Sequence, residues 1–392
     1  MTTRERQRDS HERAPESIEG SADSGAIVFE GVTKRYPDGT VAVSGLDLTL
    51  PAGALTVLAG PSGCGKTTML RMINRLERLS EGRLSIGGRD VMSVDATRLR
   101  RRVGYVMQHA GLFPHHTIAA NIATVPRLLG WEKARIRSRV EELIALVGLD
   151  ATLAERYPHQ LSGGQQQRVG LARALAADPP ILLMDEPFAA VDPIVRVRLQ
   201  EELLDLQRRV QKTIVMVTHD IDEAMKLGDR VAIFAAGGTI AQFDTPTRLL
   251  AAPANDFVID FIGADRELRR LALERLDALE LAPGPVALAD ESVAAARRTL
   301  QKQLGYGGVV VLDGDRTPLG WLAWERLKHA DAHARLESLA IAPWRHRLYC
   351  HDNLRSALNA LISAPGEIVP VVDAEGRHLG VVDRRQLTER LS

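Results

Sequence analysis

The chain has 392 residues, of which 45% are hydrophobic and 26% charged, a composition typical of folded globular proteins. Its 50 lysines and arginines are balanced by 50 aspartates and glutamates, so it lacks the basic excess of proteins that grip nucleic-acid phosphates. Two cysteines are too few for a disulfide framework, and no apolar run approaches the roughly 18 residues of a membrane-spanning helix.

The chain opens with a polar leader, followed by a long α/β region and a connector. Residues 1–25 are polar and charged without an apolar core, which predicts a disordered leader rather than a secretory signal. From residue 26 to residue 264, short β-branched runs alternate with helical stretches, the pattern of an α/β domain. Residues 265–282 carry charges and spaced leucines, and they predict an amphipathic linker helix.

A glycine-rich turn, GPSGCGKT, separates a strand expected over 54–59 from a helix expected over 66–76. This GxxxxGK[ST] pattern is typical of P-loops, in which backbone N–H groups and the positive helix end attract phosphate oxygens. We expect Lys66 to reach the β- and γ-phosphates and Thr67 to ligate Mg²⁺, with Cys64 as a small spacer. The expected nucleotide-binding residues here are Gly60, Pro61, Ser62, Gly63, Cys64, Gly65, Lys66, Thr67 and Thr68. A chance glycine-rich turn is the alternative interpretation.

Two carboxylates follow a second apolar strand. The run ILLM over 181–184 predicts a buried parallel strand, as does TIVMV over 213–217. Asp185 then lies at the carboxyl end of the first of these strands, where open α/β sheets bind ligands. We expect Asp185 to hold Mg²⁺ through water and Glu186 to polarise the attacking water, with a solvated acidic turn as the alternative.

The motif that decides the class of P-loop protein is LSGGQQQR, which begins at Leu161. A turn of small residues at a helix N-terminus is a second anion cradle. Followed by a helix and then by ILLMDEP, this motif resembles the ATP-binding-cassette (ABC) family. The resemblance implies that two subunits enclose two ATP molecules, the turn of one copy facing the γ-phosphate held by Lys66 of the other. The residues of that turn are Ser162, Gly163, Gly164 and Gln165.

The same resemblance assigns roles to four other residues. Tyr36 matches the aromatic residue that stacks on adenine, with simple packing in a turn as the alternative. Gln108 matches the glutamine that senses Mg²⁺ and the attacking water, and His219 matches the switch histidine that contacts the γ-phosphate. Asp192 follows Val191, where the family more often has leucine, and matches a contact across the dimer. The expected catalytic residues are therefore Lys66, Gln108, Glu186 and His219. The expected Mg²⁺-binding residues are Thr67, Gln108 and Asp185.

Several stretches resemble one branch of the family, the ATPases of glycine betaine, proline betaine, choline or carnitine uptake. They include TTMLRMINRLE, GLFPHHTIAANIATVPRLLGW and THDIDEAMKLGDRVAIF. The resemblance covers roughly residues 27–271 and implies an ATPase, with ATP and Mg²⁺ as cofactors, that energises import of such an osmoprotectant. An importer of another small polar solute stays open, as does a soluble ABC ATPase acting on nucleic acid.

The last part of the chain contains an internal repeat, residues 283–340 and 341–392, in which Asp313 matches Asp373. Each copy predicts helix, strand, tight acidic turn, strand and helix, and the two copies are expected to pack as one pseudo-symmetric α+β unit. The pair resembles tandem cystathionine-β-synthase (CBS) modules. The resemblance implies regulation by ionic strength or by an adenine nucleotide bound near Asp383, where the first copy has Ala323. A pair that only dimerises or stabilises the subunit is the alternative.

Taken together, the resemblances imply a homodimer at the cytoplasmic face of the plasma membrane, attached peripherally to two integral-membrane permease subunits. A substrate-binding protein would act with the permease, and no nucleic acid is expected as a partner. ATP binding would close the dimer, Gln108 would signal the closure to the permease, and hydrolysis would reopen it.

Overall fold

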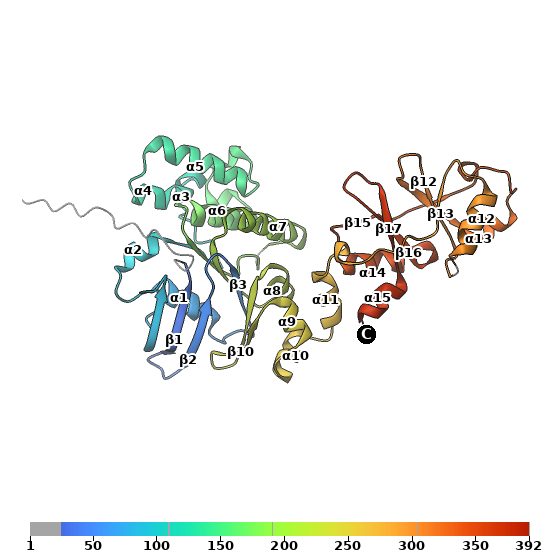
Figure 1. Cartoon of the computed structure of the whole chain (residues 1–392). Coiled ribbons are helices and arrows are strands. Elements are labelled where there is room, and N and C mark those ends of the chain that lie inside the picture. The colour runs from blue at the N-terminus through green and yellow to red at the C-terminus, as the bar shows by residue number, and fades with distance from the viewer. Residues whose placement is uncertain (1–24, 109, 190, 304, 392) are drawn as a thin grey trace, which may run out of the picture. The chain divides into compact units, whose positions relative to one another are not determined.

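The computed structural model describes residues 25–391 with the exception of residues 109, 190 and 304 (Figure 1). The leader predicted over residues 1–25 therefore lies outside the described residues, apart from Gly25. The chain divides into two compact units, up to Asp244 and from Thr245. Within the described residues, every helix is too short or too polar to cross a bilayer.

Two sheets organise the first unit. Its strands are β1 (Ile27–Arg35), β2 (Val41–Leu50), β3 (Leu55–Ala59), β4 (Glu81–Ile86), β5 (Arg89–Asp90), β6 (Val103–Val106), β7 (Ile181–Asp185), β8 (Thr213–Thr218), β9 (Arg230–Ala235) and β10 (Thr239–Asp244). An antiparallel sheet has the order β2-β1-β4-β5, and a larger sheet has the order β10-β9-β3-β8-β7-β6. All neighbours in the larger sheet pair in parallel except β10, which is antiparallel to β9.

The three central strands of the larger sheet are buried along their whole length. They read LTVLA (β3), ILLMD (β7) and TIVMVT (β8). Parallel strands are covered by helices on both faces, so continuous apolar runs suit them better than alternation. The strands predicted over 54–59, 181–184 and 213–217 are confirmed to within a residue at either end, and the α/β fold class is confirmed with them.

Eight α-helices and two 3₁₀ turns accompany these sheets in the described part of the first unit. They are α1 (Lys66–Ile73), α2 (Ala96–Arg101), α3 (Ile118–Ile122), α4 (Thr124–Leu128), α5 (Lys133–Leu146), η1 (Ala151–Glu155), η2 (Pro158–Gln160), α6 (Gly163–Leu175), α7 (Pro193–Val210) and α8 (Ile221–Leu227). In Figure 1, α3, α4 and α5 gather into a helical group on one side of this unit, and α6 joins that group to β6.

The helix after the glycine-rich turn is shorter than predicted. It ends at Ile73 instead of reaching residue 76, because Arg75 has a positive φ of 50°. The backbone N–H of Leu76 then donates to the Arg71 carbonyl at 2.8 Å, which closes the helix end as in a Schellman motif.

The second unit begins with three helices, α9 (Pro246–Ala251), α10 (Asp256–Ile262) and α11 (Arg266–Leu273). The linker helix predicted over 265–282 is wrong in its length, since α11 ends at Leu273. Beyond it, the Glu274 carbonyl accepts a hydrogen bond from Leu354 N–H, and Leu276 N–H donates to the Asp352 carbonyl. These long-range hydrogen bonds keep the backbone at Glu274 and Leu276 from continuing the α-helix. A 3₁₀ turn, η3 (Leu276–Ala278), follows.

The internal repeat is confirmed. Its first copy consists of β11 (Val286–Leu288), α12 (Val293–Lys302), β12 (Gly308–Leu312), β13 (Pro318–Ala323) and α13 (Trp324–His329). After η4 (Leu336–Ser338) and β14 (Ala342–Pro343), the second copy consists of β15 (Leu348–Tyr349), α14 (Leu354–Ile362), η5 (Pro365–Glu367), β16 (Ile368–Val372), β17 (His378–Asp383) and α15 (Arg384–Leu391). In both copies the first strand is parallel to the second, which is antiparallel to the third.

The matched aspartates build the same tight turn in both copies. Asp313 accepts backbone N–H bonds from residues 315 and 317, and Asp373 accepts them from residues 375 and 377. These bonds hold the turn that returns the chain into the third strand of each copy.

The two copies share a core and exchange short extended segments. Val310 and Trp321 of the first copy pack with Ile368 and Val381 of the second. Ala282, which precedes the first copy, pairs with Val381, whereas β14 pairs with β13. The copies therefore form one pseudo-symmetric unit, as predicted.

Candidate functional site

The carboxyl ends of four neighbouring strands bring the main predicted site residues together. The glycine-rich turn that carries Lys66 follows β3, His219 follows β8, Glu186 follows β7, and Gln108 lies just beyond β6. These strands are adjacent in the order β3-β8-β7-β6. Residues from widely separated parts of the sequence thus meet at the edge where open α/β sheets bind ligands.

The glycine-rich turn has a backbone that requires glycine at its two ends. Gly60 and Gly65 have φ of 151° and 95°, and a Cβ at Gly65 would lie 2.2 Å from the Ala42 carbonyl oxygen. At Gly63, by contrast, a Cβ would meet no atom within 4 Å, so the middle of the turn is open. The turn therefore has the tight, side-chain-free form that lets a phosphate approach the backbone.

Lys66 lies folded against this turn. Its Nζ donates to the carbonyl oxygens of Gly60 and Pro61 at 2.8 and 2.7 Å and lies 3.4 Å from the Cys64 sulfur. Cys64 is buried and acts as a spacer beneath the turn. The ammonium group is thus held at the glycine-rich turn, where it can neutralise phosphate oxygens.

Thr67 and Asp185 form the polar pair that a Mg²⁺ ion requires. The Thr67 hydroxyl donates to Asp185 Oδ1 at 2.9 Å, and the Tyr105 hydroxyl donates to Oδ2 at 3.4 Å. Asp185 is 7% exposed, and burial raises the pKa of its carboxyl. Burial and the nearby Asp185 together raise the pKa of Tyr105 to about 12.

Among the described residues, no group of three or more His, Cys, Asp or Glu side chains could hold a metal by itself. Tyr105 was missed from the sequence, because only the pairing of β6 with β7 places it beside Asp185.

Glu186 is held on three sides. Gln108 Nε2 donates to its Oε2 at 3.0 Å, and His219 Nδ1 lies 3.3 Å from its Oε1. Its backbone has a φ of 47°, which is strained for a residue with a side chain, and its N–H donates to the Val217 carbonyl at 3.0 Å. The structure thus brings three of the predicted catalytic residues into direct contact, with Glu186 at the centre.

Tyr36 lies next to the helix that follows the glycine-rich turn. Its hydroxyl is 3.3 Å from the Thr68 hydroxyl, and Lys34 Nζ lies 4.7 Å from the centre of its ring. The ring is half-buried, and its contact with Thr68 places it beside the helix that follows the glycine-rich turn.

The other predicted nucleotide contacts are separate from this cluster within one chain. Ser162 caps α6: its hydroxyl accepts from Gln165 N–H at 3.3 Å, and Gln165 Oε1 accepts from Ser162 N–H at 2.9 Å. Asp192 caps α7 by accepting from Val195 N–H at 3.1 Å. Both turns are exposed, and neither is hydrogen-bonded to the glycine-rich turn in the part of the chain that the structure describes.

Asp383 lies in the second unit with both carboxylate oxygens in use. Oδ1 accepts from Gln386 N–H at 2.9 Å, and Oδ2 accepts from the Tyr306 hydroxyl at 3.2 Å. Its counterpart Ala323 begins α13 without a side-chain cap. A ligand at Asp383 would therefore share this carboxylate with Tyr306 and the Gln386 N–H.

Comparison with known proteins agrees with this arrangement. The ABC transporter family matches residues 43–189. The osmoprotectant import ATP-binding protein OsmV of Salmonella typhimurium is 45% identical over 93% of this chain and 96% of its own. The chain belongs to the ATP-binding subunits of ABC transporters.

Other relatives of this ABC subunit point the same way. The glycine betaine/carnitine/choline transport ATP-binding protein OpuCA of Bacillus subtilis is 42% identical over 93% of this chain and 95% of its own. A solved dimeric structure of MJ0796, described as a bacterial ABC transporter cassette, has a TM-score of 0.53 and 34% identity, covering 56% of this chain and 98% of that one. A second structure of MJ0796 contains ADP and inorganic phosphate.

These findings confirm the predicted resemblance, the ABC-type P-loop fold and the ATPase class. ABC subunits of this kind bind ATP, so ATP as the expected nucleotide is confirmed, while its place at the glycine-rich turn stays a prediction. The roles of individual residues stay predictions.

Proposed function

We propose that this subunit hydrolyses ATP to drive import of a quaternary amine osmoprotectant of the glycine betaine, proline betaine, choline or carnitine type. The observation that carries the proposal is the coverage of the relatives. Those that match 93% of this chain are named for osmoprotectant, choline or carnitine transport. An Fe(3+) ions import protein of Brucella abortus is 42% identical but matches only 72% of this chain.

Thr67 and Asp185 would hold Mg²⁺ with Gln108 nearby, a fit supported by the hydroxyl–carboxylate pair and the buried, acceptor-only Asp185 carboxylate. When bound, Mg²⁺ supplies neutralising charge to the phosphate oxygens. Lys66 adds a second positive charge from its place against the Gly60 and Pro61 carbonyl groups. The N–H groups of the turn orient the phosphates without any proton transfer.

Glu186 is the residue placed to orient the attacking water. Its carboxylate is held by the hydrogen bond from Gln108, and its backbone by the N–H bond to the Val217 carbonyl. The carboxylate would accept a hydrogen bond from the attacking water in a fixed orientation. His219 reaches the same carboxylate with Nδ1, which leaves its Nε2 side available to the γ-phosphate. Positioning and charge stabilisation then account for the rate.

Two copies of the chain would complete each site. The support is the exposed N-terminus of α6, capped by Ser162, which presents a small-residue anion cradle and, among the described residues, is not hydrogen-bonded to the glycine-rich turn. In the dimer, Ser162, Gly163, Gly164 and Gln165 of one copy face the phosphates held by Lys66 of the other. MJ0796, which shares the cassette fold, is described as a dimer.

A groove in the helical group would receive the permease. It has a volume of about 880 Å³ and lies between α3, α5 and η1. Its floor includes Ala123, Ile136, Val140 and Ile144, and Arg127 and Glu141 lie at its rim. An apolar floor with a charged rim suits an amphipathic helix. The subunit would thereby sit peripherally on the cytoplasmic side of the plasma membrane, with a substrate-binding protein acting on the other side.

The second unit would regulate the ATPase as a tandem CBS pair, with repeats at 283–340 and 341–392 after an ATPase domain at 26–264. One hypothesis is that an adenine nucleotide binds at Asp383. The other is that Asp383 only stabilises the second unit, through its hydrogen bonds with Tyr306 and Gln386. Calorimetric titration with ATP and AMP separates the two hypotheses, if the full chain carries Lys66→Ala to remove nucleotide binding at the glycine-rich turn. Heat that disappears with Asp383→Ala supports nucleotide binding.

Transport assays test the proposed substrate class. The chain is co-expressed with its permease and binding protein in cells lacking their own osmolyte importers, and uptake of labelled glycine betaine, choline and proline betaine is measured. Uptake of at least one that is abolished by Lys66→Ala supports the proposal. Uptake of none, with uptake of another small solute, assigns the subunit to a different importer.

A further inference from the structure

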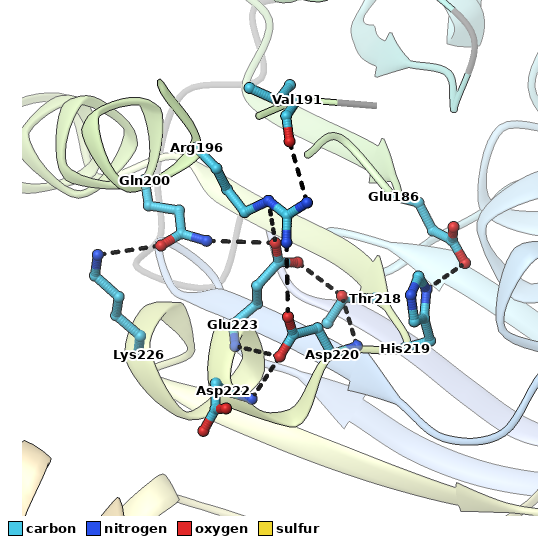
Figure 2. Close-up of polar contacts among 10 residues, drawn as sticks. All are labelled: Glu186, Val191, Arg196, Gln200, Thr218, His219, Asp220, Asp222, Glu223 and Lys226. Atoms are coloured by element: carbon cyan, nitrogen blue, oxygen red, sulfur yellow. Dashed lines mark hydrogen bonds and ion pairs between the residues drawn. The ribbon is translucent and has the colours of Figure 1, made fainter. Parts of the chain in front are cut away.

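A partly buried charge cluster lies behind His219 and links two turns of the ATPase site (Figure 2). Arg196 on α7 donates from Nη2 to the Val191 carbonyl oxygen at 3.1 Å. Its Nε lies 3.9 Å from Glu223 Oε1, and its Nη1 lies 4.0 Å from Asp220 Oδ2. One guanidinium group therefore contacts the turn before Asp192 and the turn around His219 at once.

Glu223 fastens the backbone on both sides of His219. The Thr218 hydroxyl donates to Glu223 Oε2 at 2.8 Å and accepts from Asp220 N–H at 3.0 Å. Thr218 precedes His219 and Asp220 follows it, so this hydroxyl ties the two neighbours of the histidine to one carboxylate. His219 itself has a side chain that is 59% exposed, so its neighbours fix its position more than its own packing does.

The remaining contacts of Glu223 come from α7 and α8. Gln200 Nε2 donates to Glu223 Oε1 at 3.3 Å, and Lys226 Nζ donates to Gln200 Oε1 at 3.1 Å. Glu223 is only 7% exposed, and burial raises the pKa of its carboxyl, with the nearby Asp220 acting in the same direction. Arg196 is the cation that offsets these two neighbouring acids.

We propose that Arg196 is a positioning residue for ATP hydrolysis, which joins the Asp192 turn to the His219 turn through Glu223 so that the two move together. The inference rests on the proposed function. Because Asp192 is exposed and begins α7, a second copy that docks on it shifts the start of α7, and Arg196 carries that shift to the histidine. Hydrolysis is thereby made to depend on a closed pair.

The guanidinium acts at a distance from the reacting atoms. Figure 2 shows the Glu186–His219 pair on one side of Asp220 and the Arg196–Glu223 group on the other. A cavity of about 60 Å³, lined by residues of both groups, lies at this place. It is large enough for water molecules, which occupy roughly 10–15 Å³ each in this measure. Arg196 therefore acts on the position of His219 through Asp220 and Glu223.

Removal of Arg196 leaves the buried Glu223 carboxylate beside Asp220 without the ion pairs that Arg196 makes with both acids. Like charges in a poorly solvated place repel, and an uncompensated buried charge is strongly unfavourable. We expect the His219 turn to move in response, because the His219 side chain is exposed whereas β8 before it is buried along its whole length. The expected result is a displaced histidine over an intact phosphate cradle.

The test compares Arg196→Met with Arg198→Met in the full chain, since methionine keeps the apolar stem and removes the charge. Arg198 is on the same helix, its side chain is 68% exposed, and its ion pair is with Glu202. For Arg196→Met we expect kcat to fall at least ~10-fold with KM for MgATP within about threefold, the pattern of an interaction made only in the transition state. Arg198→Met should keep both values.

A second variant separates positioning from simple destabilisation. Glu223→Gln keeps an oxygen for the Thr218 hydroxyl but removes the negative charge, so Arg196→Met combined with Glu223→Gln should recover part of the lost kcat. A wild-type kcat in Arg196→Met would overturn the inference. It would also be overturned if Glu223→Gln lowered kcat by the same factor in Arg196→Met as in the wild-type chain, because the two losses would then be independent. Absence of ATPase activity in the wild-type chain would instead overturn the proposed function.

Discussion

Replacement of Glu186 by glutamine tests the assignment of the water-orienting carboxylate. The side chain keeps its length and shape, so the strained backbone and the N–H bond to Val217 stay as they are. One amide oxygen can still accept from Gln108, whereas the new NH₂ group can no longer accept from a water or from His219. The variant therefore loses the base and retains the phosphate cradle around Lys66.

The expected magnitude follows from these contacts. A positioned general base contributes ~10²–10⁴-fold to the rate, which corresponds to ~3–5.5 kcal/mol of activation free energy. We therefore expect kcat of Glu186→Gln to fall ~10³-fold, while KM for MgATP stays within about threefold because Lys66 and Thr67 are untouched.

The assay is phosphate release over a range of MgATP concentrations, followed by size-exclusion chromatography with MgATP. Glu186→Gln should accumulate as an ATP-bound dimer, and Glu201→Gln, an exposed glutamate on α7, serves as the matched control with wild-type behaviour. Hydrolysis by Glu186→Gln within twofold of the wild-type rate would remove this residue from its proposed role.

Three other variants probe the site at different points. Asp185→Asn should abolish ATPase activity yet raise the thermal midpoint of the nucleotide-free protein. Burial raises the pKa of Asp185 in the folded state, so the ionised carboxylate destabilises the fold above that pKa and this destabilisation disappears as pH falls. Calorimetry at pH 7 and pH 4 should therefore show that the variant's gain in thermal midpoint is smaller at pH 4. Gly65→Ala, whose Cβ would lie 2.2 Å from the Ala42 carbonyl oxygen, should lower the free energy of unfolding by ~3 kcal/mol or more. Gly39→Ala should lower it by only ~1 kcal/mol, because φ is also positive there but the Cβ would meet no atom within 4 Å. Equal losses for the two variants in urea titrations would contradict the steric argument. Tyr36→Ala should raise the Kd for ATP ~10-fold through lost stacking of ~1–3 kcal/mol, with Tyr36→Phe close to wild type in nucleotide titrations.

Local motifs were enough to predict which strand ends carry the residues of the candidate ATP site. The glycine-rich turn, the acidic pair after ILLM and the histidine after TIVMV each follow an apolar strand, and the parallel order of the sheet brings those strand ends together. The contacts that sequence could not supply are long-range. Arg196 lies outside the quoted motifs, and although Glu223 lies within THDIDEAMKLGDRVAIF, only the packing of α7 beside α8 reveals their pairing.

In the second unit, too, local features could be predicted from the sequence and long-range contacts could not. The repeat was visible because Asp313 and Asp373 build identical turns, which are local. The end of α11 was not visible, because Glu274 leaves the helix to bond with Leu354 far along the chain. The exchange of extended segments between the copies, with Ala282 on Val381, likewise depends on tertiary packing and left no periodic pattern.

The central claim is that each ATP site is composed of Lys66 from one copy and the Ser162 turn from another, and mixed pairs of variants test it directly. A tagged Lys66→Ala chain and an untagged Ser162→Arg chain, both also carrying Glu186→Gln, are mixed with MgATP and captured through the tag. The mixed pair contains one intact composite site, so MgATP should increase capture of the untagged partner. Pairs of two Lys66→Ala chains or two Ser162→Arg chains contain none and should show no increase. An equal increase in like and mixed pairs, or none in the mixed pair while Glu186→Gln alone dimerises, would contradict the account.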